Sequence, residues 1–338
     1  MISAERRVFV IAEAGVNHNG DIGLAEKLVD AAKAAGADAV KFQTFRAESL
    51  ASEAAALAPY QKAAGMRDGQ KAMLVKLELD EAAHRRLQEH ARRAGIQFLS
   101  TPFDEGSADL LERLGIELFK VPSGEITNKW LIEHVARKGR PMILSTGMSS
   151  LDEVRRAVGW IREVSSAPLT ILHCVTEYPA PADQVNLRAM TTLRDALGLP
   201  IGYSDHTLGT EISVAAAALG ASVIEKHITL DRTLPGPDHA ASLEPAEFAA
   251  MVRQIRAVSS ALGDGVKRAM PCEEKNRAAA RRSLVAARDL PAGHPLTRAD
   301  LAAKRPGVGV SPADVGRVLG KKLKRALRRD EMLTEDCL

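Results

Sequence analysis

Eight short apolar runs, most of them separated by helical patterns, constrain the fold of this chain more than any other feature. Runs this short, and apolar on both faces, are typical of strands buried in a parallel sheet. Eight strand–helix units in succession fit a closed (β/α)8 barrel better than an open sheet. The predicted strands are Val8–Ala12, Ala39–Phe42, Gln97–Ser100, Leu118–Val121, Pro141–Leu144, Leu169–His173, Ile201–Tyr203 and Val223–Glu225.

Two stretches depart from this alternation. The segment from Phe45 to Leu79 is too long for a simple loop, and we expect a lid or an inserted helical excursion over the barrel mouth. After Gly263 the strand–helix pattern gives way to a polar connector, turns and a β-like run. We therefore predict a catalytic barrel over residues 1–270, a linker over 271–282 and a small, mostly β domain over 283–338.

Composition excludes several classes of function. The net charge of +3 is small for 338 residues, and an aromatic content of 4% offers no platform for stacking bases, so nucleic acid is not an expected partner. No apolar run reaches the roughly 18 residues that a membrane helix needs, and the polar N-terminus does not resemble a signal peptide. Cys174, Cys272 and Cys337 are too scattered for a disulfide framework, which favours the cytoplasm.

Polar residues gather at the ends of the predicted strands. In a (β/α)8 barrel the chemistry lies at the carboxyl ends of the strands, where loops from all eight meet. Convergence of so many polar strand ends is hard to explain by packing alone, so we predict a reaction site there. The residues concerned are Glu13, Lys41, Gln43, Thr101, Lys120, Ser123, Ser145, Tyr178, Ser204, His206, Glu225 and His227.

Lys41 and Lys120 are cations on two of these strands, with hydroxyl groups around them. Lysines together with hydroxyls and loop amides suit a phosphate and a carboxylate. The alternative is that each lysine pairs with a barrel glutamate such as Glu13, Glu125 or Glu225.

His206 and His227 end two successive strands. Adjacent strands lie about 4.8 Å apart, so both imidazoles can reach one ion. Two histidines with waters or a carboxylate suit Mn²⁺, with Mg²⁺ or Co²⁺ as alternatives. Glu225 points to the same side of its strand as His227 and is a candidate to bind the ion through water, while Asp205 is a candidate to orient His206. The alternative is that each histidine is structural.

Nine motifs follow one another along the barrel region. They are residues 13–20 (EAGVNHNG), 40–44 (VKFQT), 100–103 (STPF), 120–125 (KVPSGE), 144–148 (LSTGM), 173–179 (HCVTEYP), 202–207 (GYSDHT), 225–227 (EKH) and 235–239 (PGPDH). In this order they resemble the N-acetylneuraminate (sialic acid) synthase family, which includes the legionaminic and pseudaminic acid synthases. The C-terminal region around residues 304–307 (KRPG) is similar to the antifreeze-like (SAF) domain of that family, so the resemblance runs over essentially the whole chain.

The resemblance implies a reaction between phosphoenolpyruvate, water and an open-chain amino-sugar, which is N-acetylmannosamine or a 2,4-diacetamido-2,4,6-trideoxymannose-type sugar. The products are a nine-carbon nonulosonic acid, N-acetylneuraminate or legionaminate, and phosphate. It implies a divalent metal, and a homodimer in which the SAF domains are exchanged so that Arg305 enters the partner's barrel.

Site residues also carry over from the family, motif by motif. His206 and His227 resemble metal ligands, and Glu13 is the candidate for handling a proton, with Glu225 behind it. Glu13, Gln43, Tyr178 and Asp238 resemble groups around the sugar, and Arg305 resembles the arginine that reaches the sugar from the second domain. The phosphoenolpyruvate contacts are expected to be Lys41, Thr101, Lys120, Ser123, Ser145 and Ser204.

Two departures from the family pattern bear on the substrate. Val175 stands where close relatives often have threonine, and the excursion lacks the Asn-Thr that often follows Pro59-Tyr-Gln61. Motif details nevertheless favour the neuraminate and legionaminate side over pseudaminate. Another synthase that condenses phosphoenolpyruvate with an aldose, of the pseudaminate or 3-deoxy-octulosonate type, is the nearest alternative. The sugar phosphate of the octulosonate type would need a further cationic pocket. A non-catalytic sugar-binding barrel is a third possibility, but it needs neither the lysines nor the histidines.

Overall fold

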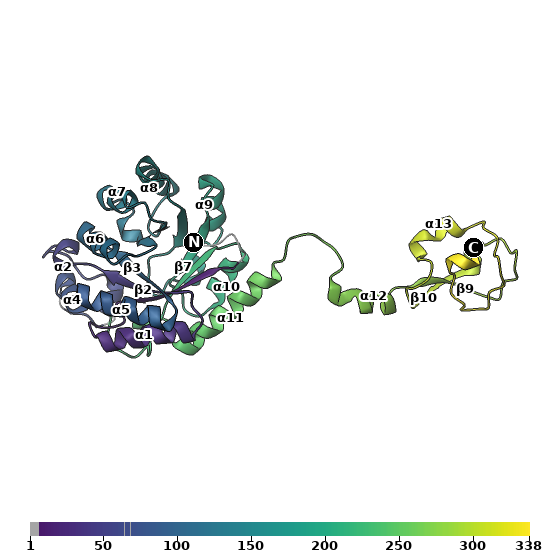
Figure 1. Ribbon diagram of the computed structural model, residues 1–338, viewed down its shortest axis with the longest axis horizontal. Coiled ribbons are helices and arrows are strands. Elements are labelled where there is room, and N and C mark those ends of the chain that lie inside the picture. The colour runs from purple at the N-terminus through teal and green to yellow at the C-terminus, as the bar shows by residue number, and fades with distance from the viewer. Residues whose placement is uncertain (1–6, 64, 68) are drawn as a thin grey trace. The chain divides into compact units, whose positions relative to one another are not determined.

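The computed structural model describes residues 7–63, 65–67 and 69–338, and the first part of the chain forms a barrel of eight parallel strands (Figure 1). The hydrogen-bonded order is β3-β2-β1-β8-β7-β6-β5-β4, and β3 lies beside β4, which closes the barrel. The predicted (β/α)8 fold is therefore confirmed. The strands are β1 (Phe9–Gly15), β2 (Ala39–Thr44), β3 (Gln97–Pro102), β4 (Phe119–Val121), β5 (Met142–Ser145), β6 (Leu169–Cys174), β7 (Ile201–Asp205) and β8 (Val223–His227).

Helices surround the strands, and their ends follow the expected signals. Asp80 caps α5 and Gly95, at φ +71°, ends it. Ser150 begins α8 with a capping box to Glu153, and Pro245 is the first residue of α11. The outer helices are α1 (Ile22–Ala34), α5 (Glu81–Ala94), α6 (Glu105–Arg113), α7 (Lys129–Arg137), α8 (Leu151–Val164), α9 (Ala189–Leu197), α10 (Glu211–Ala218) and α11 (Pro245–Ala261).

Strand alternation builds two layers inside the barrel. Successive side chains of a strand point to opposite faces, so residues two apart share the interior face. The lower layer is an apolar cluster of Ile11, Ala39, Leu99, Leu118, Ile143, Leu172 and Val223. Two residues further along each strand stand the mostly polar residues Glu13, Lys41, Thr101, Lys120, Ser145, Cys174 and Glu225. Most of the strands thus extend past the apolar runs that predicted them, into the predicted site residues.

The excursion after β2 is helical, as expected. Residues 45–79, hereafter the lid, contain α2 (Ala47–Leu50), α3 (Pro59–Ala63) and α4 (Gln70–Leu77). Phe45, Leu57, Met73 and Leu77 of the lid form an apolar cluster with Val16, which follows β1. Gly20 permits attachment of the lid: at φ +78°, a Cβ on this residue would lie 2.5 Å from the Lys76 carbonyl oxygen of α4.

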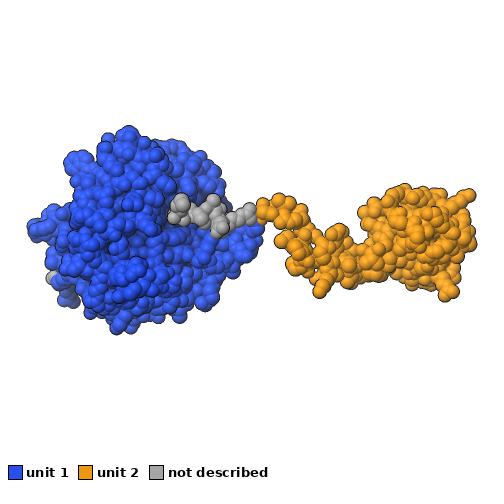
Figure 2. Space-filling model, in the orientation of Figure 1, with its two compact units in different colours: residues 1–263 blue, residues 264–338 orange. Residues whose placement is uncertain are grey.

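The chain divides into two compact units, residues 1–263 and 264–338 (Figure 2). The predicted linker, 271–282, contains the short helices η4 (Pro271–Glu273) and α12 (Glu274–Ala280). Beyond it, β9 (Ser283–Ala286) pairs with antiparallel β10 (Leu301–Lys304), and α13 (Val315–Val318) follows. This unit has a core of its own. Within the described ranges, no helix is both long and apolar enough to cross a membrane.

Candidate active site

A cavity of about 360 Å³ opens at the carboxyl ends of the barrel strands. Thirteen predicted site residues of the barrel line it, so the structure brings together side chains from all eight strands or the loops that follow them. The lid supplies a further set of lining residues, which the sequence had not identified. The predicted residues in the lining are Glu13, Lys41, Gln43, Thr101, Lys120, Ser123, Ser145, Tyr178, Ser204, His206, Glu225, His227 and Asp238.

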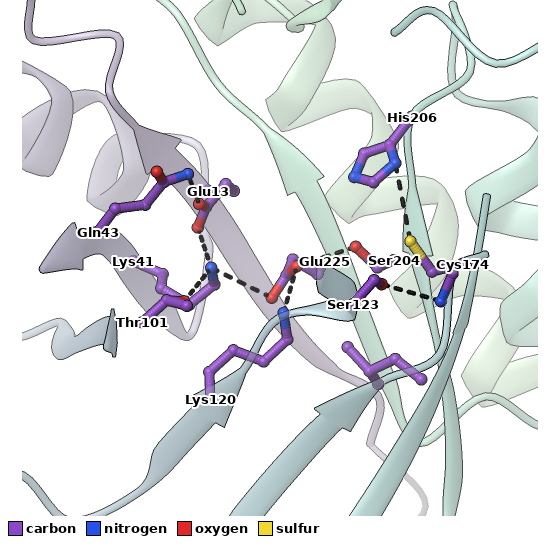
Figure 3. Close-up of polar contacts among 12 residues, drawn as sticks. Glu13, Lys41, Gln43, Thr101, Lys120, Ser123, Cys174, Ser204, His206 and Glu225 are labelled. Carbon is purple, nitrogen blue, oxygen red and sulfur yellow. Dashed lines mark hydrogen bonds and ion pairs between the residues drawn. The ribbon is translucent and has the colours of Figure 1, made fainter. Parts of the chain in front are cut away.

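The two lysines belong to one network of buried ion pairs (Figure 3). Lys41 Nζ lies 2.5 Å from Glu13 Oε2 and 3.7 Å from Glu225 Oε2, and it donates to Thr101 Oγ1 at 2.9 Å. Lys120 Nζ lies 3.2 Å from Glu225 Oε1. The glutamate pairing that was the alternative for these lysines is therefore present. Because the paired groups line an open cavity, the pairing does not remove them from reach of a ligand.

Burial and mutual attraction set the protonation of this network. Burial dominates at Glu13 and raises its pKa, although Lys41 opposes this. Burial would also raise the pKa of Glu225, but Lys120 and Lys41 outweigh it and hold that pKa at about 2. Burial lowers the pKa of Lys120, whereas at Lys41 the two carboxylates overcome burial and raise the pKa. Of the two carboxylates in this network, Glu13 is thus the more easily protonated, and Glu225 is held ionised.

Neutral side chains support both carboxylates. Ser204 donates its hydroxyl hydrogen to Glu225 Oε1 at 2.9 Å. The Gln43 amide donates to Glu13 Oε1 at 3.3 Å. These hydrogen bonds hold the carboxylates of Glu225 and Glu13 in a fixed orientation next to the lysines.

The loops after β4, β5 and β6 meet at Gly147. A Cβ there would lie 2.1 Å from Thr176 Oγ1 and 2.9 Å from Ser123 Oγ, so only glycine fits. Ser123 Oγ accepts a hydrogen bond from the Gly147 amide at 2.9 Å. Ser145 Oγ and Thr176 Oγ1 are buried without a hydrogen-bond partner among the described residues. Buried hydroxyls are rarely left unpaired, so a ligand is expected to satisfy them.

His206 and His227 face the same space, with ring centroids 5.5 Å apart. His206 Nδ1 donates to the Val175 carbonyl at 2.7 Å, so in the neutral ring Nε2 carries the lone pair. His227 Nδ1 is buried without a hydrogen-bond partner in the described part of the chain and lies 3.9 Å from Asp238 Oδ2. The Tyr178 ring lies 4.2 Å from that of His206.

The electrostatic surroundings of these groups differ. Burial lowers the pKa of His227 well below its ordinary value, which keeps this imidazole neutral. At His206 burial has the same direction, but the negative charge of the neighbouring Cys174 in its thiolate form outweighs it, and the pKa is raised. Burial, assisted by the Glu13 carboxylate, raises the pKa of Asp238 to about 7. A neutral imidazole is the form that binds a metal.

Asp205, which was predicted to orient His206, is not among the residues that line the cavity. The Asp205 side chain does not contact His206; it lies on the outer face of β7, where it pairs with Lys226 at 2.9 Å. Arg305 belongs to the second unit, where it is exposed and donates from Nε to the Ala280 carbonyl at 3.0 Å. No group of three or more His, Cys, Asp or Glu side chains among the described residues is arranged to hold a metal ion. The sequence also missed Cys174 and Thr176, which line the cavity within the 173–179 motif.

Comparisons with known proteins agree with this architecture. The NeuB family model matches residues 28–267 and the SAF domain model matches residues 281–338. The chain is 48% identical over 333 residues to N,N'-diacetyllegionaminic acid synthase of Campylobacter jejuni, which covers 98% of this chain and 100% of that protein. It is 48% identical over 324 residues to the enzyme of that name from Legionella pneumophila, covering 94% of this chain and 91% of that protein.

A solved structure gives the same result. The crystal structure of N-acetylneuraminic acid (sialic acid) synthetase from Leptospira borgpetersenii, in complex with citrate, superposes with a TM-score of 0.72. The two chains are 37% identical, and the match covers 80% of this chain and 90% of that one. The two family models together cover the barrel and the second unit, and the relatives align along nearly the whole chain. These matches confirm the resemblance seen in the motifs: this chain belongs to the NeuB family.

Proposed function

We propose that this chain is a nonulosonic acid synthase that condenses phosphoenolpyruvate with an N-acetylated amino-sugar aldehyde and water. The product is a nine-carbon acid, N-acetylneuraminate or legionaminate, together with phosphate. One observation carries the proposal: an ion-pair network with two lysines and a pair of histidines converge in a single cavity of a NeuB-family barrel. Two relatives at 48% identity are named N,N'-diacetyllegionaminic acid synthases, which supports it.

Phosphoenolpyruvate is assigned to the side of the cavity that holds Lys41 and Lys120. Protonation of Glu13 would leave two ammonium groups against the single carboxylate of Glu225, and this net positive charge suits the anionic substrate. The hydroxyls of Thr101, Ser123, Ser145 and Ser204 are placed to add neutral hydrogen bonds.

The reaction needs a proton at a defined place. The methylene carbon of phosphoenolpyruvate forms a bond to the aldehyde carbon of the sugar, whose oxygen becomes an alkoxide and takes a proton. Glu13, the most easily protonated carboxyl of the network, is assigned as the donor. Water then adds to the oxocarbenium carbon and loses one of its two protons, which leaves a hydroxyl beside the phosphate on the same carbon. The C–O bond to phosphate breaks and its electron pair leaves with the phosphate, while the hydroxyl oxygen forms the keto group and passes its proton to the departing phosphate. Gln43, Tyr178 and Asp238 are assigned to the sugar.

His206 and His227 are assigned to a divalent cation, Mn²⁺ in preference to Mg²⁺ or Co²⁺. The fit rests on the free Nε2 lone pair of His206, the neutral state of His227 and the short distance between the rings. The contribution of a cation there would be Lewis-acid polarisation of the sugar carbonyl. Since no third protein ligand stands with the two histidines in the described residues, water or substrate would complete the coordination.

Release of phosphate from phosphoenolpyruvate tests the function. The chelated protein should be inactive with either N-acetylmannosamine or 2,4-diacetamido-2,4,6-trideoxymannose, and Mn²⁺ should restore activity with at least one of them. His206→Ala and His227→Ala should each lose most of the rate with an unchanged circular dichroism spectrum. Full activity in the metal-free protein would exclude the metal. Release with arabinose 5-phosphate alone would favour the octulosonate-type reaction, and no release with any sugar would favour a binding protein.

We further propose a homodimer with exchanged SAF domains, in which Arg305 enters the partner's barrel. The exposed position of Arg305 in its unit is compatible with this role. Mixing His227→Ala with Arg305→Ala protein tests it, because random pairing of exchanged chains would restore about a quarter of the sites. No recovery, with subunit exchange confirmed by mass spectrometry, would exclude the arrangement.

Three unpaired cysteines support a cytoplasmic location.

A further inference from the structure

One buried histidine outside the cavity contacts the residues at both ends of the lid. Thr44, the last residue of β2, directly precedes the lid, and Asp80, the N-cap of α5, directly follows it. His84, in the first turn of α5, lies with Nε2 2.7 Å from Thr44 Oγ1 and with Nδ1 2.9 Å from the Asp80 carbonyl oxygen. The side chains of Thr44 and His84 are buried.

The directions of these hydrogen bonds follow from the carbonyl group. A carbonyl oxygen only accepts, so the bond to Asp80 places the hydrogen of the neutral His84 ring on Nδ1 and leaves Nε2 as an acceptor. Burial, the largest cause, lowers the pKa of His84 and favours the neutral ring. Thr44 then donates its hydroxyl hydrogen to His84, and its oxygen accepts from Ser100 Oγ at 2.6 Å. Ser100, Thr44, His84 and the Asp80 carbonyl thus form one chain of hydrogen bonds, hereafter the clamp.

The clamp stands one residue away from the cavity along two strands. Gln43 precedes Thr44 and Thr101 follows Ser100; Gln43 and Thr101 are register partners of β2 and β3, and both line the cavity. Side chains alternate along a strand, so the clamp and the cavity lie on opposite faces of the same two strands.

The position of the lid sets part of the cavity wall. Met73 and Leu77 of α4 line the cavity and are buried in the apolar cluster of the lid, so a shift of α4 would move the wall with it. The lid residues in the lining are Leu50, Gln61, Gln70, Met73, Leu74 and Leu77.

The two ends of the lid are also joined nearer the surface. The Ala47 amide donates to Glu78 Oε1 at 2.6 Å, and Arg46 pairs with the same carboxylate at 3.3 Å. The Arg46 side chain is more than half exposed, and ion pairs of this kind contribute little. Loss of a partner costs more in the buried clamp, because the groups left behind are shielded from water.

We propose that His84 is a positioning residue for the reaction. Through Thr44 and Asp80 it holds both ends of the lid, and breaking the clamp lets the lid move away from the cavity while the barrel stays folded. The role in the reaction rests on the proposed function, whereas the clamping of the lid does not.

Thr44→Val and Thr44→Ser test the clamp. Valine has the shape of threonine but neither donates nor accepts, so it breaks the clamp on both sides of residue 44, whereas serine keeps the hydroxyl. Measured by hydrogen–deuterium exchange and mass spectrometry, the amides of α4 should exchange about tenfold faster in Thr44→Val and within about threefold of the wild-type rate in Thr44→Ser. The amides of β6 and β7 should keep the wild-type rate in both variants. Unchanged exchange in the lid, or an equal rise throughout the barrel, would overturn the proposal.

Two serines supply a matched control. Ser100 and Ser213 are both buried, and each donates a hydrogen bond at 2.6 Å, Ser100 within the clamp and Ser213 to Asp205. Ser100→Ala should speed the exchange of α4, and Ser213→Ala should leave it unchanged. Equal lid exchange in the two variants would exclude the clamp. The same pair decides the question if Thr44→Val does not fold.

Phosphate release from phosphoenolpyruvate, with the sugar that the wild-type protein uses best, tests the role in the reaction. We expect kcat/KM to fall about tenfold in Thr44→Val and to return to within about threefold of wild type in Thr44→Ser. Faster lid exchange with an unchanged kcat/KM would overturn the positioning role and leave the proposed function standing. If the wild-type protein releases no phosphate with any sugar, the proposed function fails, and the exchange rates still decide whether His84 clamps the lid.

Discussion

Strands β7 and β8 carry two clusters of buried charge on opposite faces. On the inner face, Glu225 belongs to the network of Glu13, Lys41 and Lys120 that lines the cavity. On the outer face, Asp205 and Lys226 form an ion pair at 2.9 Å in which both side chains are fully buried. Lys226 directly follows Glu225 in the chain, so strand alternation alone separates the two clusters.

In the outer pair, the Asp205 carboxylate is saturated with hydrogen bonds. Asp205 Oδ1 accepts from the Thr207 amide at 2.9 Å and from its hydroxyl at 2.8 Å. Oδ2 accepts from Ser213 Oγ at 2.6 Å and from Lys226 Nζ at 2.9 Å. Lys226 also donates to the Thr207 carbonyl at 2.5 Å. The pair thereby joins the ends of β7 and β8 to α10 and leaves Asp205 no capacity for a ligand.

The inner network is not saturated. Glu225 Oε2, Ser145 Oγ and His227 Nδ1 are buried and lack hydrogen-bond partners among the described residues. Buried polar atoms without hydrogen bonds lower the stability of the free protein. They are expected at a cavity where a bound ligand supplies the missing hydrogen bonds. The comparison indicates that saturation, rather than burial or residue type, separates the structural charges of this barrel from those that we assign to the reaction.

The largest expected effect is on the outer face. Lys226→Met leaves Asp205 buried without its counter-charge, and we expect the free energy of unfolding to fall by about 3–5 kcal/mol. Urea denaturation measures it, with Arg86→Met as the control, because Arg86 pairs with Glu26 at the surface and its loss should be small. A fall no larger than the control's would show that the pair is dispensable.

On the inner face the same change should act on catalysis instead. Lys120→Met removes a cation from the cavity, and kcat/KM for phosphoenolpyruvate should fall about a hundredfold, which corresponds to roughly 2.7 kcal/mol. Glu225 keeps Lys41 at 3.7 Å and Ser204 at 2.9 Å, so stability should change less than in Lys226→Met. An unchanged KM and kcat for phosphoenolpyruvate would remove Lys120 from the site.

Much of this division could be predicted from the sequence. Apolar runs located the eight strands, and the rule that barrel chemistry lies at carboxyl ends placed Glu13, Lys41 and His227 in one site before any contact was known. The same alternation puts Asp205 on the face opposite to His206. The prediction that Asp205 orients His206 therefore conflicted with the alternation of side chains along β7.

Other features depend on tertiary packing, which leaves no local pattern. Whether Lys41 pairs with Glu13 or with a ligand depends on side-chain positions that no spacing specifies. The contributions of Gln70 and Leu74 to the cavity depend on how the lid docks, and its short helices carry no periodic signal linked to the barrel. The position of Arg305 relative to any barrel is likewise outside the reach of sequence patterns.

Removing both members of an ion pair should further distinguish the outer pair from the inner network. Asp205→Asn combined with Lys226→Met leaves no buried charge on the outer face, so the double variant should recover about 1–3 kcal/mol relative to Lys226→Met alone. The corresponding inner double variant, Glu225→Gln with Lys120→Met, should recover no activity because the lost groups are assigned to the reaction. Recovery of phosphate release in the inner double variant would mean that its charges are structural as well.

The smallest expected effect comes from two serines that differ only in their partners. Ser213 donates to Asp205 at 2.6 Å, whereas Ser145 Oγ has no partner in the described part of the chain. Ser213→Ala should therefore cost about 1–3 kcal/mol of stability and leave KM for phosphoenolpyruvate unchanged. Ser145→Ala should leave stability within about 0.5 kcal/mol and raise that KM, because the hydroxyl has nothing to lose in the free protein and a ligand bond to lose in the complex. Urea denaturation and steady-state kinetics on both variants measure the pair. If each serine affected stability and KM alike, saturation would not distinguish the two faces of the barrel wall.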